Sequence, residues 1–333
     1  MSDIYLVTGG TGYVGSFVIL QLLEQGATVR TSLRSLVKER QLRESLYNSS
    51  DKLTKEIVDA KLSVFRADLT SDDGWAEIFE GVTYVLHVAS PFPATPPDDP
   101  EDLIIPARQG TVRILSFAAK TNTVKHVVIT SSFAAIGAGH PPTKVTFNEE
   151  DWTDIVNLDR PYTISKTLAE KAAWEYVEEN KVQFGLTVLN PVLIIGPSLK
   201  NQVTNSTSLN LIKALIDGSK KDGVDHASLH LVDVRDVAKL HIQALTTEEA
   251  IGERFIVASG PTITWLDAAE ILRSRIPKNL IPNLPLREVG TPQKPLLTDI
   301  SKVKRVFKWT PIPNEESLAA TVEGILERGD LGK

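Results

Sequence analysis

Two side chains four residues apart, Tyr162 and Lys166, form a pair whose chemistry suits proton transfer. Pro161 precedes them as a favourable first-turn residue, and the spacing places the phenol and the ammonium on one face of a helix. A tyrosine with a pKa of about 10 is a weak acid at neutral pH. We expect the neighbouring ammonium to lower that pKa toward the working range, although the same spacing also arises by chance on ordinary helices.

A hydroxyl group suited to the same chemistry occurs at Ser132, in the run Thr130-Ser131-Ser132. The run ends an apolar stretch, 127–130, that we predict to be a buried strand. The carboxyl end of such a strand faces the ligand crevice of a doubly wound sheet, so a hydroxyl there could hold a carbonyl oxygen beside the tyrosine. Serines after a strand are also ordinary turn formers.

A glycine-rich turn lies between the expected strand 4–8 and the expected helix 15–24. It reads Gly9-Gly10-Thr11-Gly12-Tyr13-Val14-Gly15, which fits G-x-G-x-x-G from Gly10 and G-x-x-G-x-x-G from Gly9. Glycine lets the backbone approach a pyrophosphate, whose charge then lies at the helix N-terminus. Such turns also serve packing, but the strand–turn–helix context predicts a dinucleotide site. The consistent topological order of this turn, the hydroxyl run and the tyrosine–lysine pair argues against coincidence.

The second expected strand, 27–33, indicates which dinucleotide is bound. NAD sites usually place a carboxylate about 20 residues beyond the glycines, on the ribose 2′-hydroxyl. Here Arg34 and Lys38 occupy that region, and no carboxylate occurs before Glu39. Arg34 could bind a 2′-phosphate through charge-assisted hydrogen bonds, with Lys38 adding positive charge; otherwise both are solvated cations at a helix start. We therefore predict NADPH/NADP+ as the cofactor.

Short apolar runs alternate with helical patterns along the first two-thirds of the chain. This alternation predicts an α/β fold with a Rossmann-type, doubly wound parallel sheet covered on both faces. Asp68 follows the expected third strand, 62–65, where its side chain could meet the adenine or cap a helix. After about residue 196 the alternation ends. We expect an NADP-binding domain over 1–195, a returning strand near 253–258, and a smaller, mainly helical substrate-binding lobe over 196–333.

The composition excludes several functional classes. The 333 residues contain no cysteine, and hence no disulfide, thiol nucleophile or iron–sulfur cluster. Lys+Arg 36 against Asp+Glu 42 gives a net charge of −6 without a basic block, which argues against nucleic-acid binding. The histidines show no metal-ligand spacing, so we expect no metal and interpret His87 as a core residue. No export signal or membrane-length apolar segment is visible, and we expect a cytoplasmic protein.

These motifs together resemble those of the extended short-chain dehydrogenase/reductases. The matching stretches are Thr8 to Gly15, His87-Val88-Ala89-Ser90-Pro91, Thr130-Ser131-Ser132, Tyr162-x-x-x-Lys166 and Asn190-Pro191-Val192. The run 166–175 is especially similar to the yeast aldehyde and ketone reductases of the dihydroflavonol-reductase-like branch. The resemblance implies an NADPH-dependent oxidoreductase that reduces aldehydes and ketones to alcohols.

The same resemblance implies roles for individual residues. NADPH would deliver hydride to a carbonyl carbon, Tyr162 would protonate the oxygen, Ser132 would orient it, and Lys166 would bind the nicotinamide ribose and tune Tyr162. The implied cofactor contacts are Gly9, Gly10, Thr11, Gly12, Tyr13, Val14, Arg34, Lys38, Asp68, Leu69, Ala89, Tyr162, Lys166, Ile194 and Ser208. Phe92 and Phe133 could line a substrate pocket with Ser132, or serve packing alone.

Two departures from the family patterns argue against particular substrate classes. Plant dihydroflavonol reductases usually carry an asparagine five residues after the catalytic serine, whereas this chain has Gly137. Cinnamoyl-CoA reductases have Asn-Trp-Tyr-Cys-Tyr near the lysine, whereas this chain reads Asp159-Arg160-Pro161-Tyr162-Thr163, which argues against a CoA thioester.

Three alternatives to a simple carbonyl reductase stay open at this point. A dihydroflavonol-type reductase is disfavoured by Gly137, and a nucleotide-sugar epimerase or dehydratase is disfavoured by Arg34, since such enzymes mostly retain NAD. A non-catalytic NADP(H)-binding redox sensor is disfavoured by the intact Ser132, Tyr162 and Lys166. The expected partner is a small-molecule carbonyl compound, with no nucleic acid and no membrane, for a monomer or homodimer.

Overall fold

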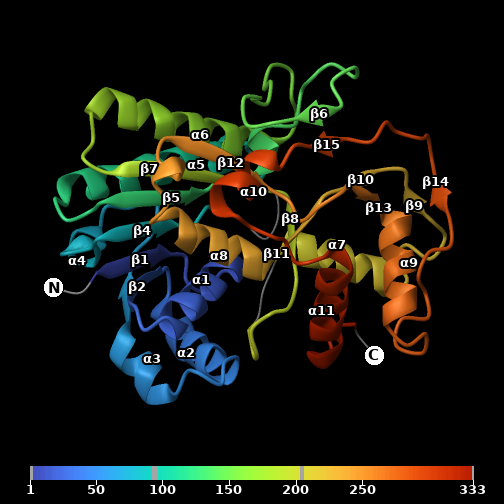
Figure 1. The fold of residues 1–333 in the computed structure, drawn as a ribbon, viewed down its shortest axis with the longest axis horizontal. Helices are drawn as coiled ribbons and strands as arrows, with labels where there is room; N and C mark the ends of the chain where they lie inside the picture. Colours follow the sequence, from blue (N-terminus) through green and yellow to red (C-terminus); the bar gives the residue numbers. More distant parts are fainter. Residues whose placement is uncertain (1–2, 92–96, 203–205, 332–333) are drawn as a thin grey trace.

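A seven-stranded parallel sheet forms the centre of the first lobe (Figure 1). The computed structural model describes residues 3–91, 97–202 and 206–331. The strands lie in the order β12-β7-β5-β4-β1-β2-β3, and every neighbouring pair is parallel. Their bounds are β1 (Ile4–Thr8), β2 (Thr28–Leu33), β3 (Leu62–Arg66), β4 (Tyr84–His87), β5 (His126–Thr130), β7 (Gly185–Pro191) and β12 (Glu253–Val257). The predicted Rossmann-type sheet is therefore confirmed.

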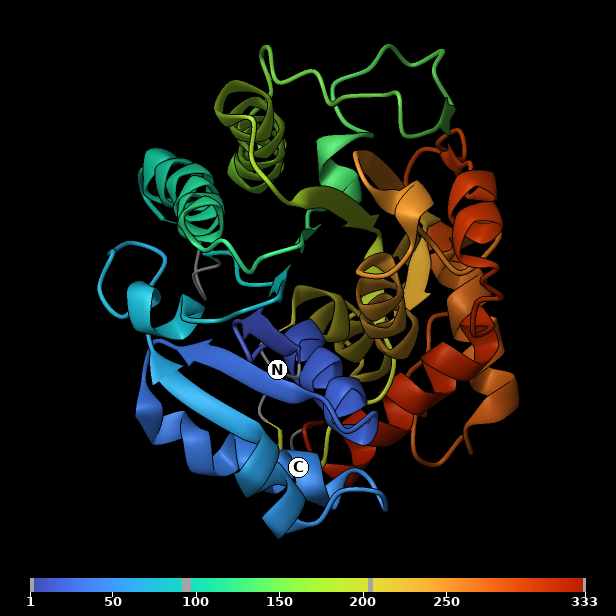
Figure 2. The same cartoon turned by 60° about the vertical axis from the view of Figure 1, so that its left-hand side comes forward.

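Both faces of this sheet are apolar because successive strand residues point to opposite sides. One set packs with α5 (Glu101–Lys120) and α6 (Pro161–Asn180), and consists of Leu6, Val85, Val127 and Val188. Their chain neighbours pack with α1 (Tyr13–Glu24) and α8 (Val234–Ala244), and are Val7, Leu86, Val128 and Leu189. Figures 1 and 2 show the two helical layers on opposite sides of the sheet.

The chain returns to the first lobe after residue 230. The strand expected near 253–258 is β12, which pairs with β7 as predicted. However, α8 also packs against α1, in the apolar cluster that contains Val18 and Leu240. The short helix α10 (Ser301–Phe307) contacts β12, with the ring centroids of Phe255 and Phe307 4.9 Å apart. Although α8 and α10 follow residue 195 in the chain, their apolar faces are covered by the first lobe.

A second, mainly helical region has its own apolar cluster. It is built from α7 (Thr207–Ile216), α9 (Trp265–Arg275) and α11 (Asn314–Glu327), with short strand pairs beside them. Figure 1 shows these helices to the right of the sheet. The pairs are β8 (Leu193–Ile195) with β11 (Leu231–Asp233), β10 (Ser228–Leu229) with β13 (Ile263–Thr264), and β9 (Val224–Asp225) with β14 (Glu288–Val289).

The remaining elements connect these two regions or cover the sheet edge. Strand β6 (Thr146–Phe147) pairs with β15 (Leu297–Thr298), which ties the loop after β5 to the C-terminal part of the chain. The connecting helices are α2 (Glu39–Asn48), α3 (Lys55–Lys61) and α4 (Trp75–Phe79). We did not expect α3 or α10 from the sequence; each is 7 residues long.

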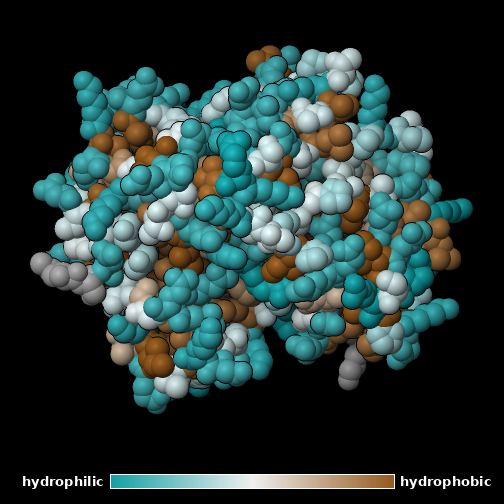
Figure 3. Space-filling model, in the orientation of Figure 1, coloured by the Kyte–Doolittle hydropathy of each residue, from teal (hydrophilic) through white to brown (hydrophobic). Residues whose placement is uncertain are grey.

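The face shown in Figure 3 is mostly hydrophilic, with hydrophobic residues in separate small patches. No helix within the described ranges has both the length and the apolar character needed to cross a membrane.

Phe255→Ala removes a fully buried ring that joins β12 to α10. We expect the free energy of unfolding to fall by about 3–5 kcal/mol, because the truncation leaves a cavity in a packed core. Chemical denaturation followed by circular dichroism measures this loss. Val37→Ala is the control, since Val37 is 88% exposed and its truncation should change stability by less than about 0.5 kcal/mol. Equally small effects would contradict a core role for the returning strand.

Candidate active site

The turn after β1 presents backbone at the start of α1. Gly9 has a φ of 73°, and a Cβ on Gly10 would lie 2.2 Å from Thr31 Oγ1. A Cβ on Gly15 would lie 2.4 Å from the Gly9 carbonyl oxygen. Side chains at Gly10 and Gly15 would therefore clash with β2 and with the turn itself, and the positive φ of Gly9 favours glycine. Gly12 caps α1 without a side-chain hydrogen bond, and the first turn carries no acidic residue. The positive end of the helix dipole is thus suited to an anionic pyrophosphate.

Ala89 lies beside this turn, at the point where the sheet order reverses between β1 and β4. Its backbone N–H donates to Thr8 Oγ1 over 3.0 Å, and a Cβ on Gly9 would lie 3.0 Å from the Ala89 Cβ. Ligands of doubly wound sheets bind at such a switch point. The structure therefore brings Ala89 and the glycine turn together, as the motifs predict.

Arg34 and Asp68 meet beyond the ends of β2 and β3. Burial acts to raise the pKa of Asp68, but hydrogen bonds from the Thr70 N–H and hydroxyl and the charge of Arg34 lower it below its usual value. Asp68 does not cap α4, which begins after Gly74. Arg34 is exposed, as is Lys38 at the end of the 3-10 turn Leu36–Lys38. Two cations therefore stand at the edge where a 2′-phosphate is expected.

Leu69 behaves differently from Asp68. Its side chain packs against α5, since a Cβ on Gly110 would lie 2.9 Å from the Leu69 Cβ. Its carbonyl oxygen accepts a hydrogen bond from the Arg113 guanidinium. Leu69 thus fixes the loop against α5, which holds the adjacent Asp68 in place.

The hydroxyl groups of Ser132 and Tyr162, which come from two different elements, form a hydrogen bond. Ser132 caps a short 3-10 turn after β5, where its Oγ accepts from the Ala134 N–H over 3.1 Å. Tyr162 stands in the first turn of α6, directly after Pro161. Burial of the phenol raises the pKa of Tyr162, and its hydrogen bond with Ser132 acts in the opposite direction. The phenol is therefore protonated at neutral pH.

Lys166 is buried one helical turn beyond Tyr162. Its Nζ donates to the carbonyl oxygen of Thr130 over 3.2 Å. Burial lowers the pKa of Lys166 to about 8, and the charge of Glu170 opposes that shift. Our expectation that this ammonium would lower the pKa of Tyr162 is not met, because desolvation raises that pKa.

Two buried histidines lie behind this set. His87 bonds Thr8 Oγ1 through Nδ1 over 2.9 Å, and burial together with the charge of Lys166 lowers its pKa to about 3. The interpretation of His87 as a core residue is confirmed. The other, His241, bonds the hydroxyl of Thr130 over 2.6 Å, and burial lowers its pKa to about 4. No sequence spacing signals His241, because it reaches Thr130 from α8, 111 residues away.

Phe133 packs between two rings beside the catalytic serine position. Its centroid lies 5.9 Å from that of Phe147 and 5.8 Å from that of His230. A Cβ on Gly137 would lie 2.5 Å from Phe133 Cε1, so the ring fills the space that a side chain at 137 would need. Phe92, the other expected pocket residue, lies outside the described residues. No local pattern links His230 to Phe133, because the two residues are distant in the chain.

Ile194 and Ser208 are the two predicted cofactor residues with the fewest sequence landmarks. Residues close to each of them in the chain hydrogen-bond to Tyr13 of the glycine turn or share an apolar cluster with it. Ile194 is the centre of β8, and two residues later the Gly196 carbonyl oxygen accepts from the Tyr13 hydroxyl over 2.9 Å. Ser208 is the second residue of α7, and the adjacent Leu209 shares an apolar cluster with Tyr13. Among the described residues, neither Ile194 nor Ser208 hydrogen-bonds to the glycine turn.

Gln202 is a residue near the glycine turn that the sequence did not reveal. It is buried, and its side-chain amide donates to Ser16 Oγ over 2.8 Å and to the Gly12 carbonyl oxygen over 3.3 Å. Gln202 therefore lies against the start of α1. Gln202 and Ser16 are 186 residues apart in the chain, so no short motif reveals their contact.

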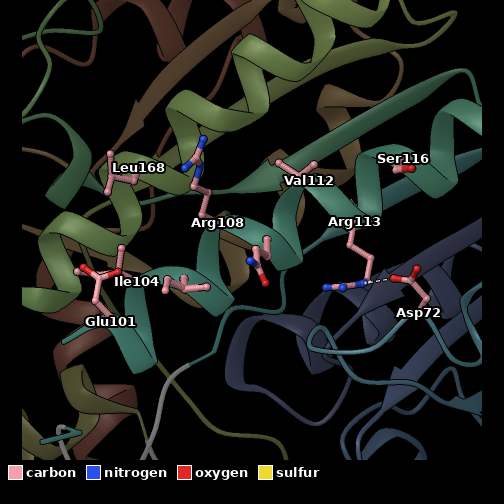
Figure 4. A pocket seen from close by; sticks show the side chains of 10 residues that line it. Asp72, Glu101, Ile104, Arg108, Val112, Arg113, Ser116 and Leu168 are labelled. Carbon is pink, nitrogen blue, oxygen red and sulfur yellow. Dashed lines mark hydrogen bonds and ion pairs between the residues drawn. The ribbon is translucent and has the colours of Figure 1, made fainter. Parts of the chain in front are cut away.

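A cavity lies elsewhere, on the outer side of α5 and α6 (Figure 4). It measures about 760 Å³ and is lined by Arg108, Val112 and Arg113 of α5, among others. From α6 it includes Leu168, which projects from a different side of the helix than Lys166. We therefore do not assign this cavity to the Ser132–Tyr162–Lys166 site.

Comparisons with known proteins give a consistent set of relatives. Residues 5–258 match the NAD dependent epimerase/dehydratase family. The chain is 34% identical over 307 residues to NADPH-dependent methylglyoxal reductase GRE2 of Saccharomyces cerevisiae, covering 86% of each chain. It is 33% identical over 339 residues to cinnamoyl-CoA reductase CAD2 of Medicago truncatula, covering 98% of this chain and 97% of that one.

Solved structures agree with these sequence matches. The crystal structure of yeast methylglyoxal/isovaleraldehyde reductase Gre2 complexed with NADPH superposes with a TM-score of 0.84 at 31% identity, covering 99% of both chains. The Gre2–NADPH complex from Candida albicans gives a TM-score of 0.83 at 28% identity, covering 99% of this chain and 100% of that one.

Acid should destabilise the fold through His87 and His241, whose pKa values in the folded chain are about 3 and about 4. In the unfolded chain both values return to about 6.5, so the unfolded state binds more protons as the pH falls. The contribution of each histidine is complete above about pH 6.5 and is lost toward its folded pKa, by about 2 kcal/mol at pH 5. Urea denaturation at about pH 7 and about pH 5 should therefore show a loss about 2 kcal/mol smaller for His241→Gln than for wild type. Equal losses would contradict a buried, neutral His241.

Proposed function

We propose that this chain, which belongs to the NAD dependent epimerase/dehydratase family, is an NADPH-dependent carbonyl reductase that converts aldehydes and ketones to alcohols. The observation that carries the proposal is the hydrogen-bonded Ser132–Tyr162 hydroxyl pair with the buried ammonium of Lys166 one helical turn away. The NADPH-dependent methylglyoxal reductase among its relatives supports the same reaction class.

The residues at the switch point fit a dinucleotide. The uncapped start of α1 suits the pyrophosphate through the backbone of Gly9 to Val14, with Ala89 beside it. Arg34 and Lys38 suit a 2′-phosphate, and Asp68 would flank the adenine from a loop that Leu69 holds against α5. Ile194 and Ser208 would complete the site near the nicotinamide. When bound, the reduced nicotinamide supplies the hydride.

The chain's own residues then handle the proton. Tyr162 is protonated at neutral pH, since the ordinary pKa of a phenol is about 10 and desolvation raises the pKa of Tyr162 further, so the phenol can donate a proton to the carbonyl oxygen. Ser132 orients that oxygen through its hydroxyl. Lys166 is charged below a pKa of about 8, and its ammonium stabilises the phenolate that remains. Reduction should therefore slow as the pH rises past the pKa of Lys166.

The substrate is best sought among small carbonyl compounds. Phe133 fills the space beside Gly137, where a dihydroflavonol reductase would carry its asparagine. The sequence 159–163 lacks the pattern associated with CoA thioesters. An NADPH-oxidation screen over small aldehydes, diketones, aryl ketones and dihydroflavonols tests both points. Steady NADPH consumption separates a reductase from an epimerase, which returns its hydride, and from a sensor, which consumes none.

Tyr162→Phe should lower kcat for every accepted carbonyl by about 10²–10⁴-fold, because the proton donor is lost. NADPH affinity, measured by fluorescence titration, should stay close to wild type. Tyr176→Phe on the same helix is the matched control and should keep full activity. Near-wild-type turnover by Tyr162→Phe would overturn the mechanism.

Arg34→Ala should weaken NADPH binding by about 10- to 100-fold and NADH binding very little, because charge-assisted hydrogen bonds to the 2′-phosphate are lost. Titration of both dinucleotides measures the two dissociation constants. Arg40→Ala removes another exposed arginine from the same region and should change neither. Equal losses of NADPH and NADH affinity would remove Arg34 from its assigned role.

A further inference from the structure

Glu170 is a buried carboxylate that the mechanism above does not use. It is 1% exposed and lies on α6, four residues beyond Lys166 and eight beyond Tyr162, so all three share one side of the helix. A buried carboxylate is costly unless it is paired and hydrogen-bonded. Its partners therefore indicate what it does.

Those partners come from three neighbouring strands of the sheet. Glu170 Oε1 lies 2.7 Å from Arg254 Nε on β12. Its Oε2 accepts from Asn190 Nδ2 on β7 over 2.6 Å, and from the hydroxyl of Ser131 at the end of β5. One carboxylate thus ties the catalytic helix to β5, β7 and β12 together.

Two of these partners lead directly to Ser132. The Asn190 side-chain amide also donates to the Ser132 carbonyl oxygen over 3.2 Å. Ser131 is the residue before Ser132, and its backbone N–H donates to the Leu189 carbonyl oxygen over 2.8 Å. Glu170 therefore holds Ser132 from both sides of its peptide unit, while the Ser132 hydroxyl bonds Tyr162.

Arg254 fixes the other end of the ion pair. It is 7% exposed, and its guanidinium carbon lies 3.7 Å from the centroid of the Trp152 ring. Its Nη1 donates to the carbonyl oxygens of Glu149 and Asp151. The loop before α6 thus clamps Arg254, and Arg254 in turn directs the Glu170 carboxylate toward Asn190 and Ser131.

Glu170 also supplies negative charge beside Lys166. Burial lowers the pKa of Lys166 to about 8, and Glu170 is the group that opposes this shift. The other titratable or charged groups around the ammonium and its carboxylate are His87 of β4, His241 of α8 through Thr130, Tyr162 of α6, and Arg254 of β12. Both histidines are neutral at working pH, because burial lowers the pKa of each.

We propose that Glu170 is a positioning residue of the reductase site, which holds Ser132 through Asn190 and Ser131 and places a compensating negative charge beside the ammonium of Lys166. This inference rests on the proposed function. It concerns residues that touch neither the carbonyl nor the cofactor positions, and so adds a supporting set of Glu170, Arg254 and Asn190 to the site.

Glu170→Gln tests the proposal, because it keeps the shape and removes the charge. We expect kcat to fall by about 10- to 100-fold with a small change in KM, since misplaced catalytic groups slow the chemical step. The alkaline limb of the kcat–pH profile should move to lower pH, because a neutral neighbour no longer favours charged Lys166. Glu175→Gln, at an exposed position of the same helix, should match wild type in both measurements.

Asn190→Ala separates the two effects and serves if Glu170→Gln does not fold. It breaks the link to Ser132 but leaves every charge in place, so kcat should fall while the alkaline limb stays at its wild-type pH. NADPH affinity by fluorescence titration should be unchanged in both variants.

A wild-type kcat and pH profile for Glu170→Gln would overturn the inference, as would a lower kcat with an unmoved alkaline limb. Should Glu170→Gln not fold, a wild-type kcat for Asn190→Ala would overturn it. Tyr162→Phe distinguishes this failure from failure of the proposed function. If Tyr162→Phe is inactive while Glu170→Gln behaves as wild type, only the role of Glu170 is lost.

Discussion

Burial of the Lys166 ammonium is the constraint on which the site depends. A cation taken out of water must be matched by fixed dipoles or charges, or it loses its proton. Here the Thr130 carbonyl oxygen, 3.2 Å away, and the charge of Glu170 provide that match. The hydroxyl of the same Thr130 is bonded to His241 of α8 over 2.6 Å. Through Thr130, the Lys166 Nζ thus links α6 to β5, and His241 links β5 to α8.

The order of the strands brings the remaining groups to the same place. Because β1 lies between β2 and β4, the glycine turn, Ala89 and the residues after β2 converge at one edge of the sheet. Strand β5 adds Ser132, and α6 crosses beside it to present Tyr162. A parallel sheet has this property because all its carboxyl ends lie on one side, whichever order the chain follows.

The apolar surroundings shape the chemistry as much as the polar groups do. Desolvation raises the pKa of Tyr162, which stays protonated at neutral pH, and lowers the pKa of Lys166 to about 8. Phe133, packed on Phe147 and His230, limits the room beside Ser132. Desolvation therefore shifts the pKa values of the two titrating groups, and the packing of Phe133 limits the space for a carbonyl compound.

Local spacing by itself determined the sheet, the glycine turn and the shared helical face of Tyr162 and Lys166, because each depends on a period or a turn of a few residues. Tertiary structure alone decided that α8 rejoins the first lobe, and that Glu170 pairs with Arg254, 84 positions away by their residue numbers (254 − 170). It also reversed the expected direction for the pKa of Tyr162, because desolvation depends on what the completed fold packs around a group. Residues that are distant in the chain and meet only through packing have no short sequence pattern that would predict their contact.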